Sequence, residues 1–141
     1  MALMLNGDQV MAFLDEVFPQ VRGDFSIDHL ESHRIIMRLN VAERHLRPGN
    51  TVSGPSMFAL ADVCVYALVM AMIGPKPLAV TTNLSIDFMR KPVAGVDLLA
   101  DCTLLKLGKL LAVGDVHIMS EGSDKRVAHA SVTYAIPPDA A

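Results

Sequence analysis

The fold of this chain is decided by residues 51–75, which read TVSGPSMFALADVCVYALVMAMIGP. The pair Gly54-Pro55 predicts a helix start, because proline is tolerated in the first turn, where its missing N–H has no intrahelical partner. The pair Gly74-Pro75 predicts the helix end. The residues between these signals are apolar on every face of the predicted helix. Such a helix is surrounded by the rest of the protein, so we expect it at the centre of the fold.

Asp62 is the one charged residue in this apolar segment, residues 57–73. A carboxylate is costly to bury, and it rarely lies in such a segment without a partner or a chemical task. The residues alone leave two interpretations open. Asp62 is either a structural carboxylate, bonded to backbone N–H groups or to a basic side chain, or a functional group. The functional question therefore starts from Asp62.

The same segment has some features of a membrane span. Residues 57–73 are slightly short of the roughly 20 residues that a bilayer-crossing helix needs, and Asp62 lies well inside them. Gly-Pro pairs bracket the segment, and strand-like sequence follows it. We therefore expect a buried core helix and no membrane partner.

The composition limits the classes of function. A length of 141 residues predicts a single domain over residues 1–141. A hydrophobic content of 52% is high for a small monomer, so we expect a homodimer, with dimers pairing further. A net charge of −3 argues against nucleic acid as a partner. The N-terminus lacks the basic start of a signal peptide, which favours a cytoplasmic location.

The sequence on both sides of the central helix predicts a second helix and an antiparallel sheet. An amphipathic pattern predicts an N-terminal helix within residues 1–20, and residues 137–141 are expected to form a flexible tail. Alternating apolar and polar residues, with short turns between them, predict strands joined into a meander. The strands are predicted over residues 24–30, 33–41, 80–89, 95–107, 110–121 and 126–136.

These elements predict an α+β fold, a curved antiparallel sheet wrapped around one long central helix. Burial of the helix would contribute about 1.5–3 kcal/mol for each large apolar side chain, so it would be the main driver of folding. In the strand after the helix, strict alternation predicts that Leu84 and Ile86 share one face and that Thr81 lies on the other.

The order of elements resembles the hotdog fold, and two motifs narrow the resemblance. Ser53-Gly54-Pro55 followed by Ala59-Leu60-Ala61-Asp62 resembles a segment of the phenylacetate-pathway (PaaI-like) acyl-CoA thioesterases. Those proteins usually carry His-Gly-Gly and then Leu-Ala-Asp at the same spacing. Residues 82–92, TNLSIDFMRKP, resemble that family's strand after the helix. The resemblance covers about residues 34–134, most of the chain.

The resemblance implies a thioesterase that hydrolyses a small or medium acyl-CoA at a site between two subunits. Asp62 would be the essential carboxylate, acting as nucleophile or as general base on water. The backbone N–H of Gly54 would polarise the thioester carbonyl, and Thr81 would help to hold the attacking water. Coenzyme A enters as part of the substrate, so no separate cofactor is expected.

The chemistry of these residue types agrees with that assignment. A glycine at a helix start presents a backbone N–H without a side chain in the way, and the helix N-terminus favours developing negative charge. Asp62 lies two turns after Pro55 and about 10 Å along the axis, on nearly the same side of the helix. A bound thioester, or one reaching across a subunit boundary, could bridge that gap.

Two positions depart from the family pattern, because Ser53 replaces its histidine and Pro55 its second glycine. Both are candidate substrate-binding residues, although Ser53 cannot supply imidazole chemistry. The departure leaves open a non-catalytic acyl-CoA or lipid-binding hotdog protein. A hydratase or dehydratase is a weaker alternative, since such enzymes generally use a histidine and residues 51–87 contain none.

Basic residues are needed for the phosphates of coenzyme A. Arg90 and Lys91, at the end of the strand that carries Thr81, are the preferred candidates, although solvated surface charge is the common alternative. His117 and His129 are expected on different strands, without a metal-ligand spacing, so no metal site is predicted.

Overall fold

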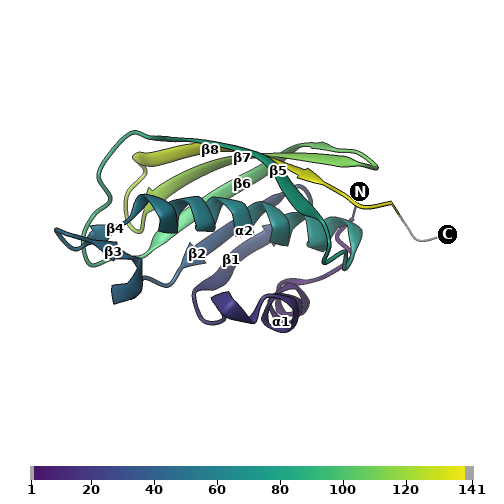
Figure 1. Cartoon of the computed structure of the whole chain (residues 1–141), viewed down its shortest axis with the longest axis horizontal. Helices are drawn as coiled ribbons and strands as arrows, with labels where there is room; N and C mark the ends of the chain where they lie inside the picture. The colour runs from purple at the N-terminus through teal and green to yellow at the C-terminus, as the bar shows by residue number, and fades with distance from the viewer. Residues whose placement is uncertain (1, 139–141) are drawn as a thin grey trace.

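The computed structural model describes residues 2–138, in which one long helix, α2 (Gly54–Ile73), lies against one face of an antiparallel sheet (Figure 1). This arrangement confirms the predicted α+β architecture. Of the predicted tail, residues 139–141 lie outside the described range. The remaining elements are, in chain order, α1 (Gly7–Val17), η1 (Pro19–Val21), β1 (Phe25–Glu31), β2 (Arg34–Leu39), η2 (Glu43–His45), β3 (Leu46–Arg47), β4 (Thr51–Val52), β5 (Val80–Phe88), β6 (Leu98–Leu107), β7 (Leu111–Ser120) and β8 (Arg126–Ala135).

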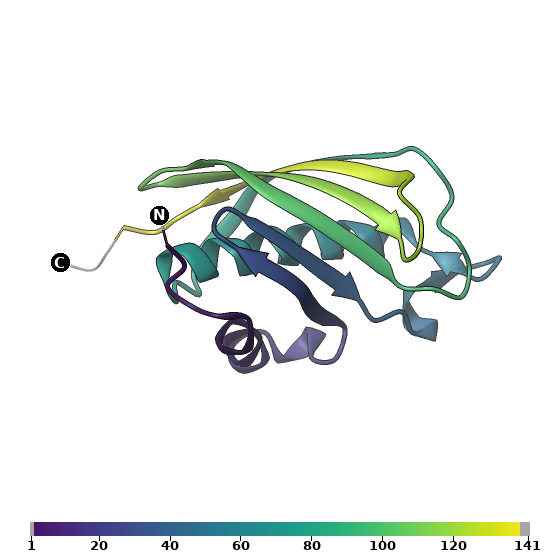
Figure 2. The ribbon, with the colours of Figure 1, turned by 180° about the vertical axis from the view of Figure 1, so that it is seen from behind.

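Within the described residues, the main sheet has the strand order β1-β2-β6-β7-β8-β5, and all neighbouring strands are antiparallel. Figure 2 shows the same sheet from behind, with β7 between β6 and β8. The strand β5 follows α2 in the chain but pairs with β8, so it forms one edge of the sheet. That position places β5 beside the central helix.

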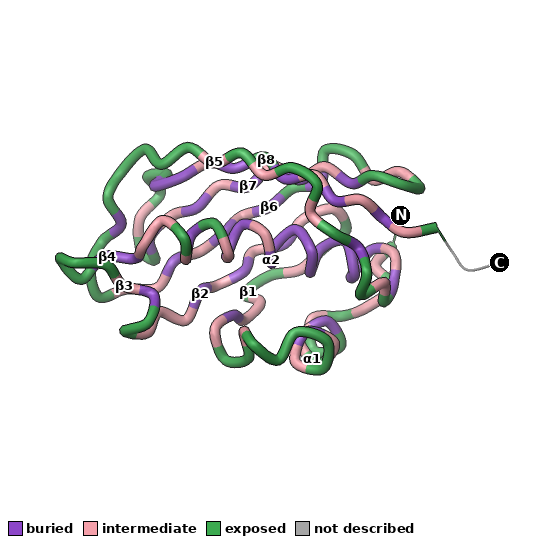
Figure 3. The backbone as a smooth tube through the Cα atoms, in the orientation of Figure 1, coloured by how far each residue is buried: buried purple, intermediate pink, exposed green. Residues whose placement is uncertain are grey.

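Helix α2 begins and ends as the Gly-Pro pairs predict. Ser53 is the N-cap and its side chain accepts from the backbone N–H of Ser56 at 3.3 Å. Gly74 ends the helix with a φ of 87°, a conformation that favours glycine. By length and composition the helix could cross a membrane, but 72% of its most apolar 18-residue stretch is buried inside this fold. Figure 3 shows that most of α2 is buried, with the exposed and half-buried positions mainly in its first half.

A glycine allows the sheet to approach this helix closely. Gly114 lies on the inner face of β7, where an added Cβ would come within 2.7 Å of Val65 Cγ2 and 3.3 Å of Cys102 Sγ. Real Cβ atoms do not approach another heavy atom as closely as 2.7 Å, so a side chain here would force Val65 or the neighbouring backbone to shift. The neighbouring residue, Asp115, points to the opposite, outer face.

The segment between β2 and α2 contains η2 and the short ribbon β3–β4. One prediction about local structure is wrong. The strict alternation predicted for β5 fails because its register against β8 shifts between Thr81 and Asn83. An irregularity of this kind changes the face to which the following residues point. Thr81 therefore lies on the same, helix-facing side as Leu84 and Ile86, which are also half-buried.

Candidate active site

Asp62 lies on the side of α2 that faces β5 and β8. Its Oδ1 accepts two hydrogen bonds, from Thr81 Oγ1 at 2.6 Å and from Tyr134 OH at 2.6 Å. Across residues 2–138, no basic side chain and no backbone N–H binds this carboxylate, and its Oδ2 has no donor. The two hydroxyls therefore fix the carboxylate through one oxygen and leave the other available.

Tyr134 is a buried residue of β8 whose hydroxyl lies between the carboxylate and the backbone carbonyl of Asp62. Burial and the nearby charge of Asp62 raise the pKa of Tyr134 well above its usual value. The hydroxyl therefore keeps its proton and donates a hydrogen bond to the carboxylate. The Tyr134 ring also lies beside that of Tyr66, with ring centroids 5.8 Å apart.

Asp62 opens into a cavity of about 290 Å³. Most of its walls are apolar, and the Thr81 and Tyr134 hydroxyls lie beside the carboxylate. An apolar group would fit such walls, because apolar surface is removed from water on binding. The lining residues are Val17, Phe18, Asp62, Val63, Tyr66, Pro77, Ala79, Val80, Thr81 and Tyr134.

Gly54 faces a different cavity, of about 500 Å³, at the start of α2. Its backbone N–H finds no acceptor among the described residues, as expected in the first turn of a helix. A Cβ at this position would lie 3.4 Å from the ring of Phe88. The lining residues are Arg47, Thr51, Val52, Gly54, Met57, Phe88, Met89, Arg90, Lys91 and Pro92.

Within one chain, the candidate residues therefore fall into two groups. Asp62 and Thr81 share the first cavity, whereas Gly54, Arg90 and Lys91 line the second. The separation follows from helix geometry, since Asp62 lies about 12 Å further along the axis than Gly54 by its rise per residue. Ser53 lines neither cavity, because its hydroxyl caps the helix and donates to Ser56 Oγ at 3.0 Å, and Pro55 also lies outside both linings.

Tyr134 is the site residue that sequence reasoning missed. A signal was present, because the inward-facing positions before it on the last strand are small and apolar: Ala128, Ala130 and Val132. A large aromatic residue with a hydroxyl in such a row usually has a hydrogen-bond partner inside the protein. Asp62, the one charge on the central helix, was the available acceptor.

The sequence and the fold are similar to those of several known proteins. Residues 49–127 match the profile described as the thioesterase superfamily. A proposed thioesterase from Silicibacter sp. TM1040 is 62% identical in sequence to this chain. Its crystal structure matches with a TM-score of 0.92, over 98% of this chain and 96% of that chain. A mutant of the phenylacetic acid degradation protein PaaI from Thermus thermophilus is 26% identical to this chain. Its structure matches with a TM-score of 0.72, over 84% of this chain and 99% of that chain. A proposed esterase from Pseudomonas aeruginosa is 28% identical over 116 residues, 82% of this chain and 84% of that protein.

Proposed function

This chain belongs to the thioesterase superfamily, and we propose that it hydrolyses the thioester bond of a small or medium acyl-CoA. The hotdog fold and the resemblance to PaaI-like thioesterases, both expected from the sequence, are confirmed by the family match and the similar structures. The observation that carries the proposal is the environment of Asp62. Its carboxylate opens into a largely apolar cavity, with one oxygen held by two hydroxyls and the other without a donor.

The free oxygen, Asp62 Oδ2, can act in either of two ways. As a nucleophile it attacks the thioester carbon, the C–S bond breaks, coenzyme A leaves as thiolate, and water then hydrolyses the acyl-aspartate anhydride. As a general base it takes a proton from water, and the resulting hydroxide attacks the same carbon. Both routes add one water and give a carboxylic acid and the thiol of coenzyme A.

A second copy of the chain would supply the backbone donor that the Asp62 cavity lacks. The strand β5 runs beside α2 from Thr81, which binds Asp62, to Phe88, whose ring lies next to Gly54. A two-fold axis across the middle of β5 would pair this edge antiparallel with its own copy. Because that pairing exchanges the ends of the strand, Gly54 of the partner subunit would come opposite Asp62.

The edge of the sheet at β5 has the character of such an interface. Leu78, Val80, Phe88 and Met89 expose 78%, 56%, 52% and 54% of their surfaces at or beside this strand. An unpaired strand edge with exposed apolar residues favours pairing with another chain. In the paired arrangement, the unbonded N–H of Gly54 would stabilise the oxyanion that forms on the thioester carbonyl.

The residues around Gly54 are suited to the coenzyme end of the substrate. Arg90 and Lys91, together with Arg47, line the cavity at the start of α2. Guanidinium and ammonium groups bind phosphate oxygens through charge-assisted hydrogen bonds. The acyl group would then lie against the apolar walls beside Asp62, and the phosphates would lie at the opposite end of the site.

The test is a panel of acyl-CoA substrates assayed with a thiol-trapping dye. We expect the native chain to release coenzyme A, and Asp62→Asn to fold normally and release almost none. Equal release by both proteins would remove Asp62 from the mechanism. Tight acyl-CoA binding by the native chain without release would favour the non-catalytic binding protein.

A mixing experiment tests the shared site. Gly54→Pro removes the backbone N–H at a helix position that tolerates proline. If each site combines Asp62 with Gly54 of the partner subunit, Asp62→Asn and Gly54→Pro should each be inactive alone. After mixing, about half of the dimers are heterodimers, and each heterodimer has one intact site of two. The mixture should therefore regain about a quarter of the native activity. A mixture that stays inactive after subunit exchange, verified by native mass spectrometry, would place both groups in one chain.

A further inference from the structure

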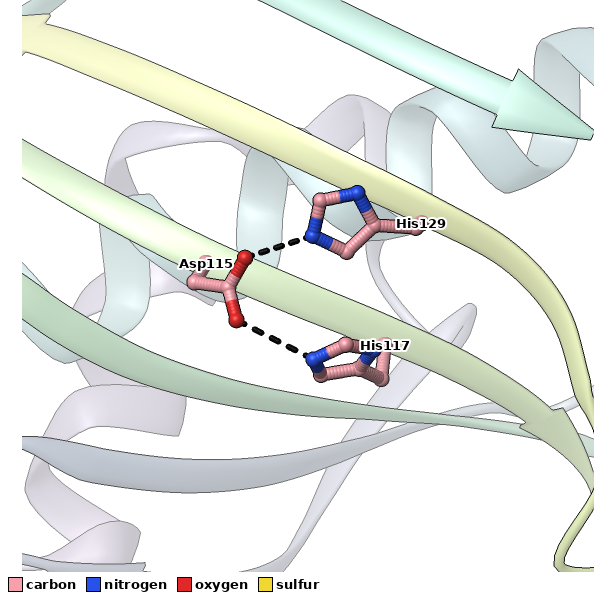
Figure 4. Close-up of side chains that lie close together, drawn as sticks. All are labelled: Asp115, His117 and His129. Carbon is pink, nitrogen blue, oxygen red and sulfur yellow. Dashed lines mark hydrogen bonds and ion pairs between the residues drawn. The ribbon is translucent and has the colours of Figure 1, made fainter.

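The outer face of the sheet carries a second cluster of titratable side chains, remote from the Asp62 cavity. Asp115 and His117 lie on β7, and His129 lies on β8 (Figure 4). The register pairs His117 directly with His129, and Asp115 is two residues before His117 on the same face. Directly paired residues and next-but-one residues are the closest neighbours on one face of a sheet. The pairing of two consecutive strands has therefore brought the two histidines together.

Each of the three side chains places a potential ligand atom near the other two. His117 Nε2 lies 3.0 Å from Asp115 Oδ2, and His129 Nε2 lies 2.5 Å from Asp115 Oδ1. One ligand atom from each residue lies within 4.8 Å of the other two. About a third of each side chain is exposed, so an ion could reach the cluster from solvent.

These contacts lie close to the geometry of a small metal centre. In a tetrahedral zinc site, bonds of about 2.0–2.1 Å place neighbouring donor atoms about 3.3 Å apart. Both N···O distances in the cluster are within about 1 Å of that separation. An ion that replaced the shared protons would require only a small outward movement of the two rings.

We propose that Asp115, His117 and His129 form a Zn²⁺-binding site on the outer face of the sheet. Two imidazoles and a carboxylate are suitable donors for zinc, and the exposed side of the cluster leaves the fourth position to water. A further carboxylate continues the same cross-strand row, since Asp87 of β5 pairs directly with His129. Its negative charge favours a cation at this place.

Arg126 competes with the ion and so provides an internal control. Its Nε donates to His117 Nδ1 at 2.8 Å, which requires that Nδ1 carry no hydrogen. A neutral imidazole that binds a metal through Nε2 carries its hydrogen on Nδ1, so this contact must break on binding. Arg126 is exposed and can move away. Removal of its charge and of its hydrogen bond should therefore strengthen zinc binding.

The experiment is a calorimetric titration of the tag-free full chain with Zn²⁺ alone after treatment with a chelator. We expect one Zn²⁺ per chain, with an affinity that falls at least tenfold in His117→Gln and in His129→Gln. Arg126→Gln should bind more tightly than the native chain. Cobalt should give the visible absorption of a low-coordinate site, and this absorption should be lost in the same two histidine variants.

His29→Gln is the matched control, because His29 is also an exposed strand histidine and lies 3.0 Å from a carboxylate, that of Glu31. Its zinc affinity should equal that of the native chain, and circular dichroism should show that all variants are folded. The proposal is overturned if the native chain takes up no stoichiometric zinc, or if the two histidine variants retain its affinity. Neither readout uses enzyme activity, so the result is independent of the proposed function.

Discussion

Two aspartates on opposite sides of the sheet, one on α2 and one on β7, show how neighbours determine what a carboxylate can do. Asp62, on the helix side, accepts both of its hydrogen bonds on one oxygen, from hydroxyl groups. Asp115, on the outer side, accepts one bond on each oxygen, from imidazoles. Hydroxyls that hold one oxygen leave the other free to react, whereas imidazoles around both oxygens can bind a metal ion.

The ionisation of Asp115, the carboxylate on the outer side, agrees with its position between two imidazoles. Burial raises the pKa of Asp115, but the hydrogen bond from His129 and the neighbouring imidazoles lower it by more, so the net shift is below its usual value. Asp115 is therefore a carboxylate held ionised by its partners. Asp62 has hydroxyl partners and an apolar cavity instead.

The largest effect is expected when the negative charge of Asp62, the carboxylate on the helix side, is removed. Asp62→Asn keeps the size of the side chain but removes the nucleophile or base, so we expect kcat to fall by about 10²–10⁴-fold. The measurement is steady-state release of coenzyme A. Asp124→Asn, in the exposed turn between β7 and β8, makes the same chemical change and should retain native activity. A loss of less than tenfold in Asp62→Asn would contradict the assigned role.

A variant of Gly114 tests how closely α2 packs against the inner face of the sheet. Gly114→Ala would place a methyl group against Val65, and we expect the free energy of unfolding to fall by about 1–3 kcal/mol. Urea denaturation followed by circular dichroism measures the change. Gly7→Ala is the control, because a Cβ there would meet its nearest neighbour, Ile27, at 4.0 Å. Equal stability of the two variants would show that the helix and sheet have room to spare.

A variant of Tyr134 tests how much its hydrogen bond to Asp62 contributes to positioning the carboxylate. Tyr134→Phe removes one of the two donors to Oδ1, so we expect kcat to fall about tenfold, which corresponds to roughly 1.4 kcal/mol. Stability should fall by about 1 kcal/mol. Tyr66→Phe removes a hydroxyl from the same cavity, but this one donates to the Pro77 carbonyl at 3.1 Å. A larger loss of kcat in Tyr66→Phe than in Tyr134→Phe would refute the positioning role.

Arg90 and Lys91 should give the smallest effect. Because exposed charges interact weakly through water, Arg90→Gln combined with Lys91→Gln should raise KM for acyl-CoA a few-fold and leave kcat almost unchanged. The increase should shrink in high salt. Lys125→Gln, in the turn before β8, provides the reference for loss of a remote charge. If KM of the double variant matches that of Lys125→Gln, the phosphates of the coenzyme are held elsewhere.

Much of the fold could be predicted because its signals are local. The Gly-Pro pairs and the apolar run between them predicted α2, and period-two alternation predicted the strands to within a few residues. The irregularity at Thr81 could not be predicted, since it depends on how β5 pairs with β8. That irregularity turns Thr81 toward Asp62, so strict alternation predicted the wrong face for a candidate site residue.

The sequence by itself determined that a helix apolar on all sides must be enclosed, and that its one carboxylate required an explanation. Only the tertiary structure decided which groups meet each carboxylate. Tyr134 reaches Asp62 from the last strand, and His129 reaches His117 and Asp115 through the register of β7 against β8. The physical reason is that local periodicity fixes which face a side chain takes, whereas the packing of the whole sheet fixes the register that gives it neighbours.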